Sequence, residues 1–382
     1  GNDRATANPT ANDWYETVKL NYGYNFATGE SSYDPIPDTW KKIDRVIAYW
    51  QNKGVDGFRC DFAHLVPVEA WEYLIDRAEE RDSDVFFLAE AYNSPNAPPG
   101  FSLPNLVQVG FDAVYDDANY DTLKGIFCCG KWANDLSEGL PGDFMFDKYL
   151  RYAENHDERR IASPLVDGQN PDDSGFGSIE AGKPAAGTLY LLGSGPILVF
   201  NGQTVGEPGA GREGFGGEDG RTTIFDYWTM PQMAKWVNGH KYDGGGLDEK
   251  HRQLRSWYAD LLALAQKPGF ASGNIYDLQN ANKDNDGYTG GRYLFSFLRY
   301  DTERDAAWLV VANYDRQAHR PTIRVPNEAL QFAGREAGEL TLAPALSGGD
   351  SQSVSASRLA EKGIEISVGT RGFRVFEISG GG

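Results

Sequence analysis

The sequence predicts an α/β fold with a parallel sheet, followed by an antiparallel β domain. Apolar, strand-like runs alternate with helix-like segments up to about residue 266, and several of these runs end in polar residues. Beyond about residue 268 the apolar residues alternate with period two, which is typical of strands. We therefore expect mostly loop over 1–36, an α/β part over 37–270 and an antiparallel β part over 271–382.

The α/β part should begin with a helix that Asp38 caps and Gly54 ends. A strand over 55–62 follows, and a second helix opens at Pro67. The first helix should bury one face, made of Trp40, Ile43, Val46, Ile47 and Trp50. The second should bury Trp71, Leu74, Ile75 and Ala78.

Four further strands are expected, with helices between them. The strands cover 84–92, 111–117, 149–157 and 195–202, and the helices cover about 120–127 and 184–192. A fifth helix is expected over 250–266, after a Gly-rich, polar stretch. Strands that alternate with helices form parallel sheets, and enzymes of this architecture build their sites where the strands end. Asp61, Glu90, Asp157 and Gln203 all lie at such ends.

Composition narrows the range of partners. The net charge of −19 argues against nucleic acid and anionic membranes, and it suits a neutral substrate. No apolar run approaches the ~20 residues of a membrane span. The three cysteines, Cys60, Cys128 and Cys129, have no regular spacing, which predicts neither a disulfide framework nor a zinc site.

Two acidic residues differ in their sequence surroundings. Asp61 stands two residues after Arg59, so both side chains point to one face of a strand, and the opposite charge keeps a carboxylate ionised. The alternative is a structural ion pair. Glu90 follows the apolar run 85–89, and such surroundings keep a carboxyl protonated. An ionised and a protonated carboxyl are what retaining glycosidases use, at ~5–5.5 Å from each other.

Three segments resemble signature stretches of a known family. They are GFRCDFAH (57–64), FFLAEAY (86–92) and ENHD (154–157), in this order. Together they resemble the alpha-amylase superfamily of glycoside hydrolases, glycoside hydrolase family 13. VFNGQ (199–203) and GRTTIFDYW (220–228) add to the likeness. The resemblance implies the C-terminal portion, strands 4–8, of a TIM (β/α)₈ barrel, followed by an antiparallel β-sandwich domain.

The resemblance also implies roles for individual residues. Asp61 would be the nucleophile, Glu90 the general acid/base, and Asp157 the aspartate that binds sugar hydroxyls beside the cleaved bond. Arg59 would support Asp61, and His156, preceded by Asn155, would hydrogen-bond the sugar.

Other candidates carry a structural alternative. His64 has either a sugar-binding or a structural role. Tyr92, Tyr227 and Trp228 are candidate sugar platforms, although core or rim packing is the more common fate of such residues. Arg221 and Gln203 are candidates at the rim of the site.

Some family features are absent from this sequence. The Asn–His pair that ends the third strand is not found, and Lys19 stands where many members carry a calcium-binding Asp. No cofactor is expected to be required, and calcium is left open because some of its usual ligands are absent. Five parallel strands cannot close a barrel of eight. Either another polypeptide supplies the missing part, or this piece stands alone with an incomplete, inactive site.

The leading functional hypothesis is retaining hydrolysis of α-1,4-linked glucans such as starch, glycogen and maltooligosaccharides. Transfer of the glycosyl group, as in a transglycosylase or maltosyltransferase, is the first alternative. A non-catalytic glucan-binding fragment is the second. The family resemblance favours a secreted or periplasmic location.

Overall fold

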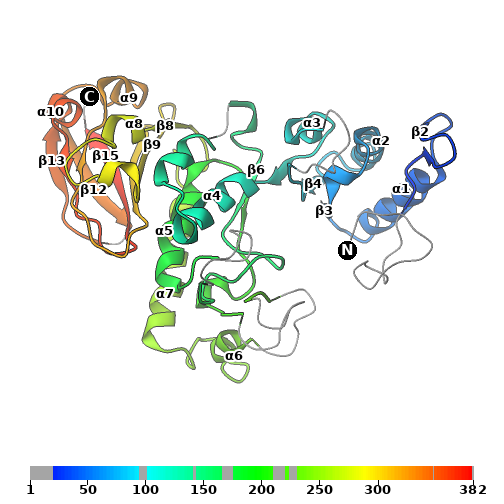
Figure 1. The fold of residues 1–382 in the computed structure, drawn as a ribbon, viewed down its shortest axis with the longest axis horizontal. Coiled ribbons are helices and arrows are strands. Elements are labelled where there is room, and N and C mark those ends of the chain that lie inside the picture. Colours follow the sequence, from blue (N-terminus) through cyan, green and yellow to red (C-terminus); the bar gives the residue numbers. More distant parts are fainter. Residues whose placement is uncertain are drawn as a thin grey trace. The chain divides into compact units, whose positions relative to one another are not determined.

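The computed structural model describes residues 20–93, 101–140, 143–165, 175–209, 220–222, 230–346 and 348–380 (Figure 1). The chain divides into two compact units, Gly1–Tyr115 and Asp116–Gly382. This division falls inside the segment expected to form one α/β part, so the boundaries at 36/37 and 270/271 stay predictions. Each unit is described by itself.

The first unit contains a short parallel sheet with helices. Strands β3 (Gly57–Cys60), β4 (Phe86–Ala89) and β5 (Ala113–Tyr115) pair in this order and run parallel. Helices α1 (Asp38–Gln51), α2 (Val68–Glu79) and α3 (Leu103–Gln108) accompany them. A small antiparallel pair, β1 (Tyr24–Asn25) and β2 (Glu30–Ser31), lies in the segment predicted to be mostly loop.

Helix α2 confirms the predicted periodicity. Its four expected core residues, Trp71, Leu74, Ile75 and Ala78, are all buried. Burial of a large apolar side chain contributes about 1.5–3 kcal/mol, which explains why this face points inward.

Helix α1 differs from its prediction in two ways. Asp38 is the first helical residue, and Pro37 occupies the N-cap position. Val46 and Trp50 are exposed, whereas Asp44 is buried on the inner face. Asp44 can be buried because both of its carboxylate oxygens bind arginines of α2 and its C-terminal flank, at 2.8 Å from Arg77 and 2.6 Å from Arg81. A buried charge is tolerated when it is paired in this way.

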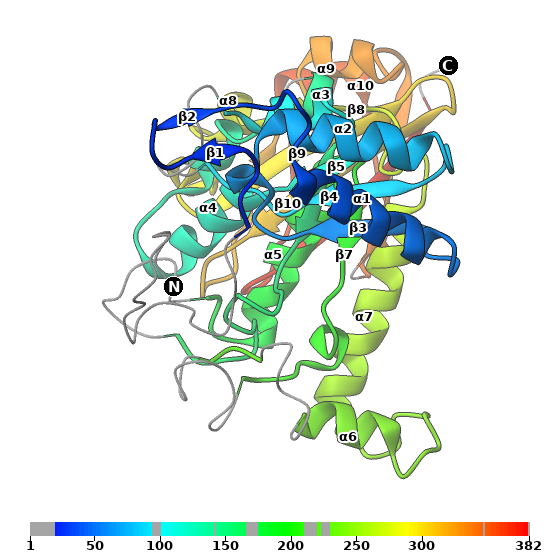
Figure 2. The same cartoon turned by 90° about the vertical axis from the view of Figure 1, so that its right-hand side faces the viewer.

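The second unit begins with a parallel pair of strands and the helices around it. β6 (Tyr149–Tyr152) and β7 (Ile197–Leu198) pair in parallel and are shorter than predicted. Three helices, α4 (Asp117–Cys128), α5 (Ile179–Leu192) and α7 (Glu249–Ala265), match predicted helical segments. Figure 2 shows the short helix α6 (Pro231–Val237) beside the start of α7.

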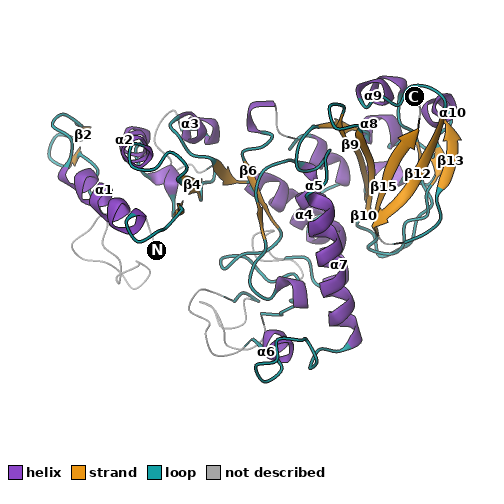
Figure 3. Cartoon of the chain, turned by 180° about the vertical axis from the view of Figure 1, so that it is seen from behind, coloured by secondary structure: helices purple, strands orange, loops and turns teal. Residues whose placement is uncertain are grey.

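The rest of the second unit is antiparallel, as predicted. One sheet of six strands has the order β13-β12-β15-β10-β9-β8 (Figure 3). Its strands are β8 (Asn274–Asp277), β9 (Leu294–Asp301), β10 (Ala306–Asn313), β12 (Glu339–Leu346), β13 (Gln352–Ser355) and β15 (Phe373–Gly380). β11 (Thr322–Ile323) and β14 (Ile364–Glu365) form a separate pair, so the two sheets are unequal in size.

Short helices complete the core of this β region. They are α8 (Gln279–Asn282), α9 (Asn327–Phe332) and α10 (Ala356–Glu361). Leu330 of α9 and Leu359 of α10 belong to one hydrophobic core with Leu309 and Phe376 of the large sheet. Among the described residues, no helix has the length and apolar character needed to span a bilayer.

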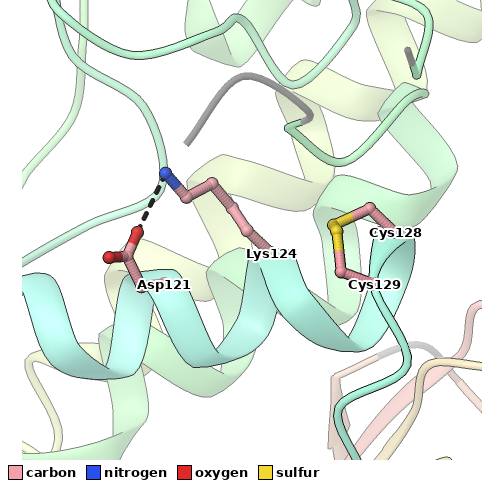
Figure 4. Close-up of a disulfide and its surroundings, with 4 residues drawn as sticks. All are labelled: Asp121, Lys124, Cys128 and Cys129. Atoms are coloured by element: carbon pink, nitrogen blue, oxygen red, sulfur yellow. Dashed lines mark ion pairs between the residues drawn. A yellow bond between two sulfur atoms is a disulfide. The ribbon is translucent and has the colours of Figure 1, made fainter. Parts of the chain in front are cut away.

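The end of α4 carries a disulfide that the sequence does not predict. Cys128 and Cys129 are neighbours in the chain, and their sulfurs are bonded to each other (Figure 4). This bond cross-links no distant segments, so it provides no disulfide framework. Cys60 is a free thiol, and burial raises its pKa to about 12.

Candidate active site

Two acidic residues follow neighbouring parallel strands in the first unit. Asp61 comes directly after β3, and Glu90 comes directly after β4. The last residues of these strands, Cys60 and Ala89, are register partners. The Glu90 N–H also donates to the Cys60 carbonyl at 2.9 Å. The strand pairing therefore brings Asp61 and Glu90 to the same edge of the sheet.

Arg59 connects the two acids. Its NH1 bonds Asp61 Oδ1, and its NH2 lies 3.1 Å from Glu90 Oε2. Its Nε donates to the Tyr115 hydroxyl of β5 at 3.3 Å. One guanidinium on β3 thus links groups from three neighbouring strands. The expected contact between Arg59 and Asp61 is present, and the contact with Glu90 goes beyond it.

The two carboxyl groups have different environments. The side chain of Asp61 is 64% exposed, whereas that of Glu90 is only 4% exposed. Burial raises the pKa of Glu90, although its hydrogen bond from the Phe62 amide and the charge of Arg59 oppose this effect. The direction agrees with the sequence prediction, because desolvation disfavours the charged form of a carboxyl group.

A tight turn after β3 brings a backbone donor to Glu90. Phe62 has left-handed backbone angles, with φ of 45°, which is uncommon for a residue with a side chain. Its N–H donates to Glu90 Oε2 at 2.9 Å. The turn leads into a short 3₁₀ helix, Ala63–Leu65, whose first N–H donates to the Glu90 carbonyl at 2.9 Å.

Two further candidates lie beside this turn. The Tyr92 hydroxyl donates to Glu90 Oε1 at 2.8 Å. His64 is buried, and its ring lies 5.7 Å from the ring of Tyr92 and 5.8 Å from that of Phe62, measured between centroids. His64 thus lies among aromatic rings, and both its sugar-binding role and its structural role stay predictions.

Three further candidates, Asn155, His156 and Asp157, follow β6 in the second unit. His156 Nε2 is 2.9 Å from Asp157 Oδ2. The buried Asn155 accepts the Asp157 N–H through its side-chain oxygen at 2.9 Å. Arg221 NH1 donates to the Asp157 carbonyl at 3.2 Å. The structure thus brings Asn155, His156, Asp157 and Arg221 together, and Asn155 supports the backbone of this turn.

A buried ion pair beside this turn was not expected from the sequence. Arg160 NH1 bonds Glu154 Oε1 at 2.6 Å, and both side chains are almost completely buried. Arg160 also donates to the Asn201 carbonyl at 2.7 Å and to the Thr222 hydroxyl. Arg160 therefore joins the segments that follow β6 and β7. The sequence shows only an acid six residues before an arginine, and this spacing does not reveal burial.

Other candidates either have internal partners or lie outside the described residues. Gln203 is buried, and its amide donates to the hydroxyls of Tyr190 at 2.7 Å and Tyr258 at 3.2 Å. Tyr227, Trp228 and Lys19 fall on residues that the structure does not describe. Within the described ranges, no group of three or more His, Cys, Asp or Glu side chains could hold a metal ion. Calcium binding stays a prediction.

Comparison with known proteins identifies relatives by sequence. The chain is 32% identical to the alpha-amylase MalA of Haloarcula japonica over 186 residues, which cover 47% of this chain and 24% of that protein. It is also 32% identical to an alpha-1,4-glucan:maltose-1-phosphate maltosyltransferase of Rhodospirillum rubrum, over 28% of this chain and 15% of that protein. The chain thus spans about a quarter or less of the length of these relatives. No family model matches it.

The fold has solved counterparts. The crystal structure of AmyP in complex with maltose superposes with a TM-score of 0.61 and covers 94% of this chain and 70% of that chain, at 17% identity. The chain is thus similar in sequence to an alpha-amylase, as the signature stretches predicted, and it shares the fold of the solved structure. The parallel strands of this chain accordingly resemble part of the barrel of alpha-amylases, whereas the assignment of individual strands stays open.

Proposed function

We propose that this chain carries the catalytic acids of a retaining glycoside hydrolase that acts on α-1,4-linked glucans. The observation that carries the proposal is the arrangement of Arg59 between an exposed carboxylate, Asp61, and a buried carboxyl, Glu90, at the ends of adjacent parallel strands. A nucleophile must be charged and reachable, whereas an acid catalyst must retain its proton. The two environments match these two requirements.

In the first step, the Asp61 carboxylate attacks the anomeric carbon of the sugar. The bond from this carbon to the glycosidic oxygen breaks, and Glu90 donates its proton to that oxygen. A glycosyl ester on Asp61 results. Arg59 stabilises the carboxylates before and after the transfer, because it contacts both.

In the second step, Glu90 acts as the base. It takes a proton from a water molecule, whose oxygen attacks the anomeric carbon and releases Asp61. The pKa of Glu90, raised by burial, favours recovery of this proton. The configuration at the anomeric carbon is thereby retained.

The residues after β6 would bind the substrate. We assign Asp157 and His156 to the sugar hydroxyls next to the cleaved bond, on the family resemblance. Arg221 and Asn155 hold the backbone of this turn through the contacts given above. In this proposal the parallel strands β3 to β7 correspond to strands 4–8 of a (β/α)₈ barrel.

Glycosyl transfer is the second candidate. It is favoured by the relative named alpha-1,4-glucan:maltose-1-phosphate maltosyltransferase. Transfer uses the same glycosyl ester, and a sugar hydroxyl or a phosphate replaces water in the second step. Incubation with a maltooligosaccharide distinguishes the two, because transfer to sugar gives longer products and hydrolysis gives only shorter ones.

Substitution of the nucleophile tests whether the site is catalytic at all. Asp61→Asn should lower the rate of glucan cleavage by at least about 1000-fold, because no charged nucleophile remains. Asp56→Asn is the matched control, since Asp56 is an exposed acid five residues earlier, and it should keep the wild-type rate. Wild-type activity in Asp61→Asn would overturn the proposal, and glucan binding without cleavage in the wild type would favour the binding fragment.

A further inference from the structure

The two oxygens of the Glu90 carboxyl group have different partners. Oε2 accepts the Phe62 N–H at 2.9 Å and lies 3.1 Å from the NH2 of Arg59. Oε1 accepts the Tyr92 hydroxyl at 2.8 Å. A protonated carboxyl group carries one hydroxyl oxygen, and the other oxygen can only accept. Because two donors already converge on Oε2, the proton belongs on Oε1.

We infer that Tyr92 is a positioning residue for Glu90, and that its hydroxyl orients Oε1, the oxygen from which the catalytic proton leaves. This inference rests on the proposed function for its role in the reaction. It differs from a sugar-platform role, because the hydroxyl group of Tyr92, and not only its ring, is engaged.

The hydrogen bond from the Tyr92 hydroxyl to Glu90 Oε1 changes in strength during the reaction. While Glu90 is protonated, the Tyr92 hydroxyl donates to a neutral oxygen. When the proton has moved to the glycosidic oxygen, Oε1 shares the negative charge of the carboxylate, and a charge-assisted hydrogen bond is about twice as strong. Tyr92 thus favours the product state of the proton transfer. When Glu90 takes a proton from the incoming water, the bond returns to its first state.

The position of Tyr92 is set by neighbours from two other elements. Its ring lies 5.7 Å from the ring of His64 in the 3₁₀ helix, and 6.5 Å from that of Tyr115 in β5. Tyr115 also binds Arg59, which contacts Glu90. Among the described residues of this unit, the charged and titratable groups around Glu90 include Arg59, Asp61, Tyr92, His64 and Tyr115.

The test measures the protonation of Glu90 directly and needs no turnover. The chain is labelled with ¹³C at the glutamate carboxyl carbons, and the Glu90 signal is the one lost in Glu90→Gln. Its titration midpoint in Tyr92→Phe should lie about one pH unit above that of the wild type, because the charged form loses one hydrogen bond. Tyr73→Phe, the same change on α2, should leave the midpoint unchanged.

A second variant provides the test if Tyr92→Phe does not fold. With 3-fluorotyrosine at position 92, the more acidic hydroxyl donates more strongly, so the midpoint should fall. An unchanged midpoint in both variants would overturn the role of Tyr92. If the midpoints move as expected while Asp61→Asn keeps full activity, the proposed function fails and the hydrogen bond to Glu90 stands.

In an active preparation, Tyr92→Phe should lower kcat more than it raises KM. The alkaline limit of kcat/KM should move upward with the Glu90 midpoint, since the acid catalyst then keeps its proton to higher pH. A rise in KM alone, with an unchanged pH profile, would indicate a sugar platform and would contradict the positioning role.

Discussion

The segments after β4 and after β6 each carry an acidic candidate, Glu90 and Asp157, and the two residues are held in different ways. Glu90 is fixed by donors from three parts of the first unit: Arg59 on β3, the Phe62 amide and the Tyr92 hydroxyl. In the second unit, Asp157 contacts its two preceding residues, and its backbone carbonyl accepts from Arg221. Glu90, the proposed acid catalyst, is buried and held by three donors, whereas Asp157, the proposed sugar-binding residue, is partly exposed.

The segment after β6 is also held by a residue outside the ENHD stretch, Arg160. Arg160 is buried with Glu154 and ties the chain after β6 to Asn201 and Thr222. The comparison shows two ways to hold a carboxyl group: donors can bind it directly, as they bind Glu90, or a buried ion pair can hold the segment next to it, as Arg160 and Glu154 do beside Asp157.

The largest effect on stability is expected when that ion pair is broken. Arg160→Met should lower the free energy of unfolding by about 3–5 kcal/mol, because Glu154 is left buried without its partner. Lys250→Met removes an exposed ion pair with Glu180 in the same unit and should cost less than about 1 kcal/mol. Urea denaturation measures the free energy of unfolding of both variants. Equal losses in the two variants would show that the buried pair contributes no more than the exposed one.

A half-buried carboxyl group of the second unit, Asp117, should make the stability of the fold depend on pH. Burial, reinforced by the charge of Asp121, raises the pKa of Asp117 to about 7. A raised pKa means that the folded state binds the proton more tightly, so this contribution is complete below pH 4 and is lost as the pH rises to about 7.

Asp117→Asn removes this titration. The stability of the variant relative to the wild type should therefore rise between pH 4 and pH 8, by up to about 4 kcal/mol. Asp260→Asn, at an exposed position of α7, should show no such rise. Urea denaturation at pH 4 and pH 8 measures the free energy of unfolding of the variant and of the wild type. If their difference is the same at both pH values, the pKa of Asp117 is not raised in the folded state.

The smallest expected effect is on the alkylation rate of Cys60, the thiol next to the proposed nucleophile. Since the pKa of Cys60 is raised to about 12 by burial, its thiolate is scarce at pH 8. Iodoacetamide should therefore modify Cys60 slowly in the folded chain and rapidly in urea. After reduction, the exposed Cys129 serves as the reactive control. Rapid labelling of Cys60 in the folded chain would show that the end of β3 is more open than described.

Local sequence predicted part of the site and missed the rest for a physical reason. The two-residue spacing of Arg59 and Asp61 and the apolar run before Glu90 are local patterns, and they predicted the contact and the burial. The burial of Asp44 on α1 depends on arginines more than thirty residues away. The partners of Arg160 likewise come from segments remote in the sequence. Such contacts are decided by how elements pack, which spacing along the chain does not encode.

In the proposed mechanism, Asp61 forms the covalent bond to the sugar and Glu90 transfers the proton. A 5-fluoro-α-glucosyl fluoride slows the second step, so the glycosyl ester accumulates and can be located by peptide mass spectrometry. We predict that the label lies on the peptide that contains Asp61 and that Asp61→Asn abolishes it. Label on Glu90 or Asp157, or glucan cleavage with no labelled carboxyl group, would contradict the account.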